Sequence, residues 1–187
     1  MRFSRNLFAR LAIAFILISL SLAGCSSAKT STNQPLYAIT TIRTTLELPQ
    51  LPLDFVETTN MANSPTCGLV IKIYRDADGH VYSVDPQTNQ VVEIDARTIL
   101  SKIPPHAPIL LTEELEARVL KYFEVTIPNF ESRKSSWQYE EGRKGNYFFF
   151  SWYSDMMPGT MNRSFAQIGM DINGVLFTYY NTLSLHK

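Results

Sequence analysis

The chain has few of the residue types on which enzyme sites depend. It contains 2 cysteines and 3 histidines. No stretch follows the patterns of a nucleophilic serine, a zinc-binding helix or a glycine-rich phosphate loop. The histidines, His80, His106 and His186, are far apart in the sequence and none lies in such a pattern. The sequence therefore offers no candidate for catalysis or cofactor binding, and we predict that the protein is not an enzyme.

Long apolar runs and a net positive charge are also lacking. The apolar run Leu11–Leu20 is much shorter than the roughly 20 residues that a membrane-spanning helix needs. The whole chain has 17 basic and 17 acidic side chains. Arg2, Arg5 and Arg10 are three of the basic residues, so residues 25–187 keep 14 basic against 17 acidic side chains. This balance excludes the basic surface with which proteins bind nucleic acid.

The beginning of the chain has the pattern of an export signal. Basic residues precede the apolar run, and Leu22-Ala23-Gly24-Cys25 follows it. A basic flank, a short apolar core and small residues at the cleavage point are typical of a secretory signal peptide. The segment LAGC resembles the lipobox of bacterial lipoproteins. The resemblance implies cleavage before Cys25 and a diacylglycerol on its sulfur, which would anchor the protein in a membrane. The alternative is an ordinary signal peptide that ends near a cysteine.

These features predict the location of the protein. Residues 1–24 are the predicted lipoprotein signal peptide, and residues 25–35, rich in serine and threonine, are a predicted flexible tether. We expect the protein in the cell envelope, anchored through Cys25. In a Gram-negative host, Ser26 favours the periplasmic face of the outer membrane; otherwise the site is the outer face of the plasma membrane. Cys67 would then be the one thiol without lipid, either buried and inert or exposed and reactive.

Residues 36–100 are predicted to be a β-rich region. Alternation through Leu46 and Leu48 predicts a strand within residues 36–48. Further strands are predicted at 68–74, 81–84 and 90–94, separated by turn-forming segments that begin at Asp76 and Asp85. The segment Asp76-Ala77-Asp78-Gly79 lacks the later oxygen ligands of a calcium-binding loop, which favours a plain turn over a metal site.

The second half predicts a helix followed by strands. Residues 101–110 contain three prolines and form the predicted connector. Apolar side chains every three to four residues then predict a helix, capped by Thr112 and limited by Pro128. Four strands follow, at 136–140, 147–153, 165–170 and 175–183, with a turn over residues 141–146 and a hairpin at Asn173-Gly174. The predicted fold class is α+β: a β-rich N-terminal region, then a helix and a four-stranded antiparallel meander.

Residues 111–187 also resemble a known family. The helix LTEELEARVLKYF, the strand YFFFSWY and the hairpin FAQIGMDINGVLFTYY are similar to the PepSY-like family, closest to its YcdB/YcdC repeat. The earlier segment DGHVYSVDPQTNQVVEI resembles the final hairpin of such a unit, with Asn89 at the place of the usual turn glycine. The resemblance implies a PepSY-like α+β unit and an association with export, protease propeptides and inhibition.

A candidate binding surface lies around the first hairpin of this unit. Trp137 and Tyr139 lie before the predicted turn and Arg143 and Lys144 lie within it, so aromatic and basic groups are close together there. Such a surface could bind a glycan, a peptide or anionic headgroups; the alternative is that the rings pack on the helix and the basic residues are solvated in turns. We therefore expect a lipid-anchored, non-enzymatic binding module for an envelope protein or peptide. The other hypotheses are a structural or assembly lipoprotein without a specific ligand and, third, a thiol-dependent or hydrolytic enzyme.

Overall fold

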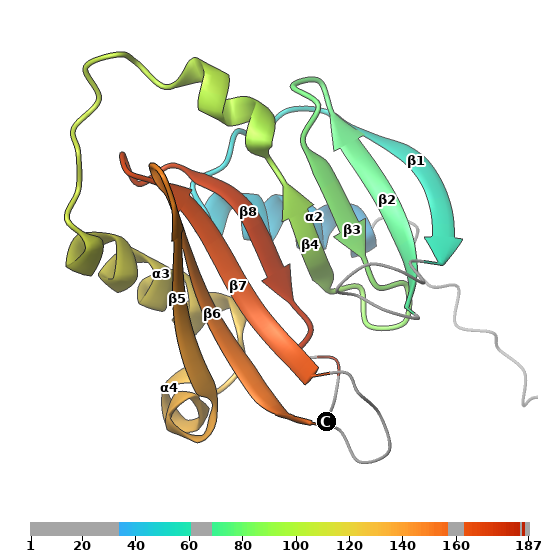
Figure 1. Cartoon of the computed structure of the whole chain (residues 1–187). Coiled ribbons are helices and arrows are strands. Elements are labelled where there is room, and N and C mark those ends of the chain that lie inside the picture. Colours follow the sequence, from blue (N-terminus) through green and yellow to red (C-terminus); the bar gives the residue numbers. More distant parts are fainter. Residues whose placement is uncertain (1–33, 61–68, 157–162, 184, 186–187) are drawn as a thin grey trace, which may run out of the picture. The chain divides into compact units, whose positions relative to one another are not determined.

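One antiparallel sheet organises the chain in a computed structural model of the protein, shown in Figure 1. The structure describes residues 34–60, 69–156, 163–183 and 185. Within them the sheet has eight strands in the order β1-β2-β3-β4-β8-β7-β6-β5. The strands are β1 (Leu53–Asn60), β2 (Val70–Asp76), β3 (Val81–Val84), β4 (Val91–Asp95), β5 (Gln138–Lys144), β6 (Tyr147–Met156), β7 (Arg163–Asp171) and β8 (Leu176–Asn181).

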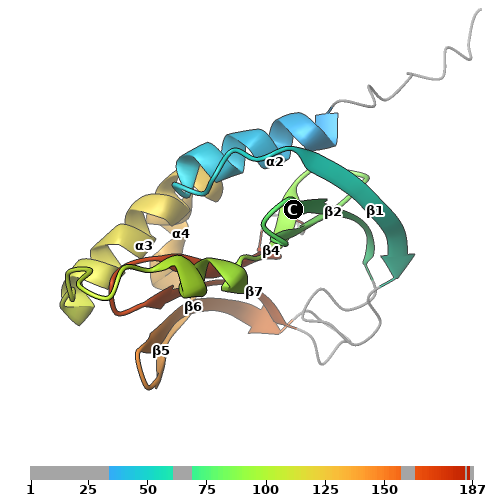
Figure 2. The same cartoon turned by 90° about the horizontal axis from the view of Figure 1, so that it is seen from above.

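Helices cover one face of this sheet. The α-helices of the described residues are α2 (Gln34–Thr45), α3 (Thr112–Thr126) and the short α4 (Phe130–Arg133), and the 3₁₀ turns are η1 (Arg97–Lys102) and η2 (Lys134–Ser136). Figure 2 shows α2 and α3 on the same face of the sheet. Across the described part of the chain, no helix combines the length and the apolar character that crossing a membrane requires.

The chain repeats one arrangement, a helix followed by a four-stranded meander. The first unit consists of α2 and β1 to β4, and the second of α3 and β5 to β8. The last strands of the two units, β4 and β8, pair with each other. Glu93 lies opposite Tyr180 and Asp95 lies opposite Thr178. The two units therefore form one continuous sheet.

The predicted α+β class is confirmed, as is a helix ahead of the C-terminal strands. The predicted sheet of four strands is wrong, because the sheet has eight. The four C-terminal strands do form a meander, but β8 is paired on both sides and continues the sheet into β4. An unpaired strand exposes backbone N–H and C=O groups. Pairing β8 with β4 satisfies those groups for both units.

The prediction of a strand within residues 36–48 is wrong, because most of this segment forms helix α2. Its apolar residues Ile39, Ile42 and Leu46 recur at helical spacing and face the core. The hydroxyl groups of Thr40, Thr44 and Thr45 each donate to the carbonyl oxygen four residues earlier, at 2.9, 3.0 and 3.1 Å. The threonines that favoured a strand in isolation are thus accommodated in a helix, because burial of the apolar stripe outweighs their propensity.

Several other boundaries differ from the predictions at exposed positions. Strand β1 was not predicted, and its side chains are mostly exposed. Strand β5 continues to Lys144 through the segment predicted as a turn, and the turn itself is limited to Gly145 and the next residue. Thr112 is the first residue of α3 rather than its cap, and the Glu114 carboxylate accepts the N–H of Leu111 at 2.8 Å. Exposed edge strands tolerate charged residues, so their sequences lack the apolar alternation of half-buried strands.

A single hydrophobic core lies between the helices and the sheet and draws on both units. Phe123 of α3 is fully buried and packs against the rings of Phe130, Trp152 and Tyr179, at centroid distances of 5.3, 5.3 and 6.3 Å. Ile39 of α2 belongs to the same cluster. Full burial of one such side chain stabilises the fold by about 1.5–3 kcal/mol. The core therefore holds the two units together.

Candidate functional site

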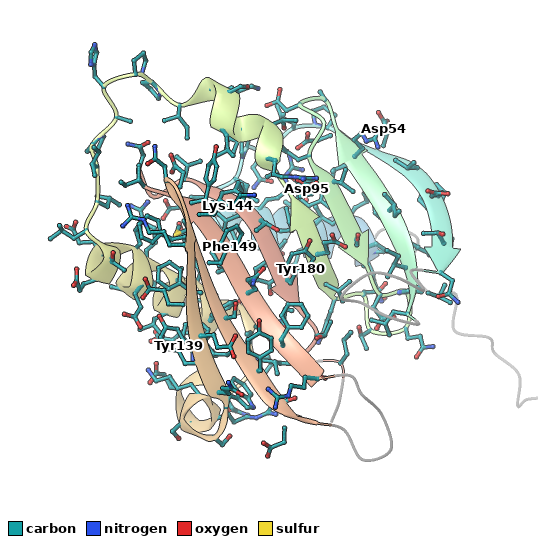
Figure 3. The ribbon with its side chains drawn as sticks, viewed as in Figure 1. Asp54, Asp95, Tyr139, Lys144, Phe149 and Tyr180 are labelled. Atoms are coloured by element: carbon teal, nitrogen blue, oxygen red, sulfur yellow. The ribbon has the colours of Figure 1, made fainter. Side chains whose placement is uncertain are left out.

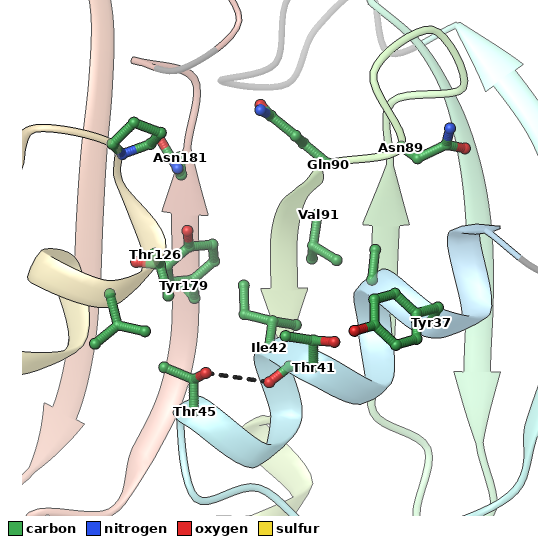
Figure 4. Close-up of a pocket in the computed structure, with 13 residues that line it drawn as sticks. Tyr37, Thr41, Ile42, Thr45, Asn89, Gln90, Val91, Thr126, Tyr179 and Asn181 are labelled. Carbon is green, nitrogen blue, oxygen red and sulfur yellow. Dashed lines mark hydrogen bonds between the residues drawn. The ribbon is translucent and has the colours of Figure 1, made fainter.

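A groove of about 330 Å³ opens between the two units (Figure 4). Helix α2 forms one wall, and the end of α3 forms the other. Strands β4 and β8 contribute the floor at the place where the units join. Its lining residues are Tyr37, Ala38, Thr41, Ile42, Thr45, Asn89, Gln90, Val91, Val125, Thr126, Pro128, Tyr179 and Asn181. We call this the α2–α3 groove.

The walls of the α2–α3 groove are mainly apolar, and its rim is exposed. Ile42 and Val91 pack into the core beneath the groove. At the rim, Tyr37 is 75% exposed and Val125 is 68% exposed. None of the lining residues carries a charged side chain. Small-molecule and peptide sites are typically concave and apolar with a few polar groups, and this groove has that composition.

Two buried polar atoms beside the groove lack a hydrogen-bond donor. They are Oε1 of Gln90 and Oδ1 of Asn181, which have no partner among the described residues. Figure 4 shows both side chains at the same end of the groove. A buried acceptor without a partner costs about 1–3 kcal/mol. A ligand that donated N–H or O–H groups to these oxygens would remove that cost.

Two hydroxyl groups of the groove already donate to the backbone. The hydroxyl groups of Thr45 and Thr126 donate to helix carbonyl oxygens, at 3.1 and 2.9 Å. Their oxygens keep lone pairs that can accept. Burial raises the pKa of Tyr179 to about 12, and polar contacts with Thr126 and Asn181 oppose that rise. The phenol is therefore neutral, and the groove suits an uncharged ligand, to which its hydroxyl and amide groups can donate and from which its free oxygens can accept.

The residues of the sequence-predicted binding surface do not gather in one place. Trp137 packs on Phe130 at 5.8 Å between ring centroids, and Tyr139 packs on Trp152 at 4.7 Å. The guanidinium of Arg143 lies 4.7 Å from the centre of the Phe148 ring. These three residues lie on the helix-covered face of the sheet. Lys144, labelled in Figure 3, pairs with Tyr147 in the ladder of β5 and β6 and therefore lies on the other face. Both rings contact the core, but Tyr139 stays 39% exposed, so a binding role for these residues stays a prediction.

The face of the sheet away from the helices carries a second set of aromatic residues. Phe177 contacts Tyr147 and Phe149, and Phe165 contacts Tyr153 and Tyr180, at centroid distances of 5.3 to 6.0 Å. Phe149 and Tyr180 are labelled in Figure 3. The rings contact one another, and Tyr147 among them is 39% exposed.

A glutamate lies beside these rings. Burial raises the pKa of Glu93, while hydrogen bonds from Tyr180 and Ser83 oppose the rise. Burial likewise raises the pKa of Tyr180 to about 12. Because Glu93 lies opposite Tyr180 in the ladder of β4 and β8, the two groups form a partly buried acidic pair at the centre of the sheet.

A buried polar cluster lies outside the groove, between α2 and the hairpin of β2 and β3. The Asp76 carboxylate contacts Nδ1 of His80 at 2.9 Å and accepts the hydroxyl of Tyr82 at 3.1 Å. The guanidinium of Arg43 lies 3.7 Å from the same carboxylate and donates to the carbonyl oxygens of Pro49 and Leu51. The ion pair of Arg43 with Asp76 connects α2 to β2, and contacts from His80 and Tyr82 to the same carboxylate stabilise this connection. Nε2 of His80 has no partner among the described residues.

The two aspartate-led motifs form the same kind of turn. Oδ1 of Asp76 accepts the N–H groups of residues 78 and 80, and Oδ1 of Asp171 accepts those of residues 173 and 175. Gly79 and Gly174 follow with φ of 82° and 79°. Asp78 pairs with Lys102 at 2.6 Å, and this pairing lowers the pKa of its carboxyl. In residues 34–60, 69–156 and 163–183, no three acidic, histidine or cysteine side chains converge as a metal site would require.

Both cysteines lie outside the described residues. Cys25, the predicted lipidation site, and Cys67 both fall in segments that the structure does not describe. The groove residues were missed in the sequence because α2, which supplies five of them, had the pattern of a strand. Helical spacing of Ala38, Thr41, Ile42 and Thr45 was the signal that could have placed them on one side of a helix.

Comparisons with protein-family models, curated proteins and solved structures find no match for this chain. The fold and the groove therefore define its class: an α+β protein of two helix-plus-four-strand units with an uncharged groove between them.

Proposed function

We propose that the protein is an exported, lipid-anchored module of the cell envelope that binds a peptide or a segment of an envelope protein without catalysing a reaction. The α2–α3 groove is the proposed binding site. The observation that carries the proposal is its composition, an uncharged apolar groove with unpartnered acceptors on Gln90 and Asn181.

A peptide matches this groove in two respects. Its backbone N–H groups can donate to the oxygens of Gln90 and Asn181, which have no donor. Its apolar side chains can pack against the walls near Ile42 and Val91. No lining residue carries a cation, so a carboxylate or phosphate would lose its hydration without a charged partner. The rim residues Tyr37 and Val125 would be covered when a peptide lies in the groove.

The location in the envelope rests on the beginning of the sequence. The signal peptide and the lipobox-like segment end at Cys25, and the predicted tether leads into α2. A lipid on Cys25 would thus connect through a short tether to one wall of the groove. The PepSY-like resemblance, with its association with protease propeptides and inhibition, also favours a protein or peptide as the partner.

Selection from a random heptapeptide phage library tests the groove directly. The full chain in detergent would be the target, and enriched peptides would be measured by fluorescence titration. We expect Thr41→Trp, which fills the groove, to weaken binding at least tenfold. Thr44→Trp is the matched control, because Thr44 is exposed on the same helix but does not line the groove.

Two results would count against the proposal. If no peptide were enriched over an empty support, a structural lipoprotein without a ligand would be the better explanation. If enriched peptides bound equally to wild type and to Thr41→Trp, the binding site would lie elsewhere on the surface.

A further inference from the structure

Strand β5 forms one edge of the sheet and is exposed along its whole length. It pairs with β6, and its other side faces no strand of the described residues, as Figure 1 shows. All seven of its residues are exposed. An edge strand presents a row of backbone N–H and C=O groups that can pair with another strand. β5 is therefore a surface on which a further strand can be added.

The opposite edge of the sheet is less suited to such pairing. In β1, the register with β2 shifts between Phe55 and Glu57. A bulge of this kind twists an edge strand and protects it from pairing. The ladder of β5 with β6 runs through seven pairs without a shift. Of the two edges, β5 is the regular one.

The charges on β5 are complementary to themselves. Glu140 and Glu141 precede Gly142, and Arg143 and Lys144 follow it. If a second copy pairs antiparallel about Gly142, Glu141 lies opposite the Arg143 position of that copy. Glu140 then lies opposite the Lys144 position, and two-fold symmetry makes each pair occur twice. Opposite charges directly across an antiparallel pair are favourable, and like charges are unfavourable.

The two faces of the sheet agree with this register. Glu141 and Arg143 lie opposite Phe150 and Phe148 in β6, so both are on the helix-covered face. Glu140 and Lys144 lie opposite residues 151 and 147, so both are on the other face. In this arrangement the helices of both copies lie on the same side of the joined sheet. The two side chains of each charge pair then project from the same face.

Neighbouring registers bring like charges together. If the two-fold axis passes through residue 141, Glu141 lies opposite Glu141 of the second copy. If the axis passes through residue 143, Arg143 lies opposite Arg143 of the second copy. Edge charges of a single sign would repel any second copy. The charges of β5 instead select one register among several.

These charges are also available for a partner. In the part of the chain that the structure describes, none of the four forms an ion pair. Glu140 accepts a hydrogen bond from Gln138, and Arg143 donates to the carbonyl oxygen of Gly145. Both contacts are local and lie on exposed side chains, so they can be exchanged when a strand is added.

We propose that β5 is a self-association edge, where a second copy of this chain pairs antiparallel about a two-fold axis through Gly142. The sheets of the two copies then form one continuous sheet. A Cβ added at Gly142 would lie no closer than 3.8 Å to Phe149, so this position on the axis tolerates a side chain.

Charge exchange tests the register. Sedimentation velocity of the full chain in detergent should show a concentration-dependent dimer. Arg143→Glu places acid opposite Glu141, and Glu141→Arg places base opposite Arg143, so each should weaken association at least tenfold. The double variant Glu141→Arg/Arg143→Glu restores opposite charges and should recover the dimer. Glu57→Arg, on the other edge, is the matched control and should leave association unchanged.

The proposal is overturned if the wild-type chain stays monomeric at all concentrations, or if the double variant associates no better than the single ones. An equal loss in Glu57→Arg would place the contact on another surface.

Disulfide formation provides a second test at the two-fold axis. Residues opposite each other in an antiparallel pair have Cα atoms about 4.5–5.5 Å apart, within the range of a disulfide. In a Cys67→Ser background, Gly142→Cys should therefore crosslink two copies on mild oxidation. Glu140→Cys is the control, because its two copies would be on the order of 13 Å apart along the strands. Equal crosslinking of both variants, or none with Gly142→Cys, would rule out this register.

Discussion

Ile94 and Tyr179 lie opposite each other in the ladder that joins β4 to β8. Each belongs to the last strand of its own helix-plus-four-strand unit, and each is buried in the shared core. Tyr179 also lines the α2–α3 groove. The pairing that unites the two units therefore also builds the floor of the candidate site.

The buried polar cluster predicts a large loss of stability when its cation is removed. Arg43→Met should lower the free energy of unfolding by about 3–5 kcal/mol, because Asp76 is left buried without a cation. The carbonyl oxygens of Pro49 and Leu51 lose donors as well. Urea denaturation followed by circular dichroism measures the change. Arg97→Met is the control, since its pair with Asp95 is largely exposed and should contribute at most about 1 kcal/mol. Similar losses in both variants would contradict this account.

Replacing Asn181, whose side-chain oxygen has no donor, should affect stability and peptide binding differently. Asn181→Leu removes a buried acceptor that has no donor but also the polar contact with Tyr179, so the free energy of unfolding should change by no more than about 1 kcal/mol. Peptides selected on the wild-type chain should nevertheless bind at least tenfold more weakly, because one hydrogen bond is lost. Thermal unfolding and fluorescence titration on the same sample separate the two effects. Unchanged peptide affinity would remove Asn181 from the site.

Glu93 predicts a specific dependence of stability on pH. Burial raises the pKa of Glu93 above its ordinary value of 4.5 in the folded state. Protonation of Glu93 therefore stabilises the folded state. This stabilisation is fully present below pH 4.5 and is lost as the pH rises through the pKa of Glu93 in the folded state. Glu93→Gln is neutral at every pH, so its stability relative to wild type should be higher at pH 7 than at pH 4.

Urea denaturation at both pH values tests this expectation. Glu113→Gln is the control, because Glu113 is exposed in the first turn of α3. Its difference from wild type should vary less between the two pH values. The same pH-independent difference for both variants would show that burial does not perturb Glu93.

We predict that a lipid on Cys25 anchors the protein in a membrane. Cys25→Ser removes the sulfur that would hold the lipid, so the chain should move from the membrane fraction to the soluble envelope fraction. Cell fractionation with immunoblotting measures the distribution, and mass spectrometry of the wild-type chain should show acylation at Cys25. Cys67→Ser is the matched control and should remain with the membrane. A Cys25→Ser chain that still sediments with membranes would argue for another mode of attachment.

Local patterns in the sequence predicted the elements that depend on local interactions. The strand at 81–84 matches β3, and the helix after the connector matches α3 within a few residues. The hairpin at Asn173-Gly174 is also present, with Asp171 holding the turn. In each case the turn chemistry or the apolar spacing operates within a few neighbouring residues, so the sequence contains the whole signal.

Elements that depend on distant partners were predicted poorly. Helix α2 forms because Ile39 and Ile42 meet a core built largely from other parts of the chain, which outweighs its threonine content. The aromatic and basic residues around β5 were recognised in the sequence. Their packing on Phe130 and Trp152 depends on where α4 and β6 lie.

The sequence by itself determined the α+β class, the turn residues and the expectation of export with a lipid on Cys25. The tertiary structure decided that β4 pairs with β8, that two units share one core, and that α2 and α3 enclose a groove. The reason is physical: turns and helices are stabilised by residues near in sequence, whereas strand pairing and burial require partners that only the folded chain brings together.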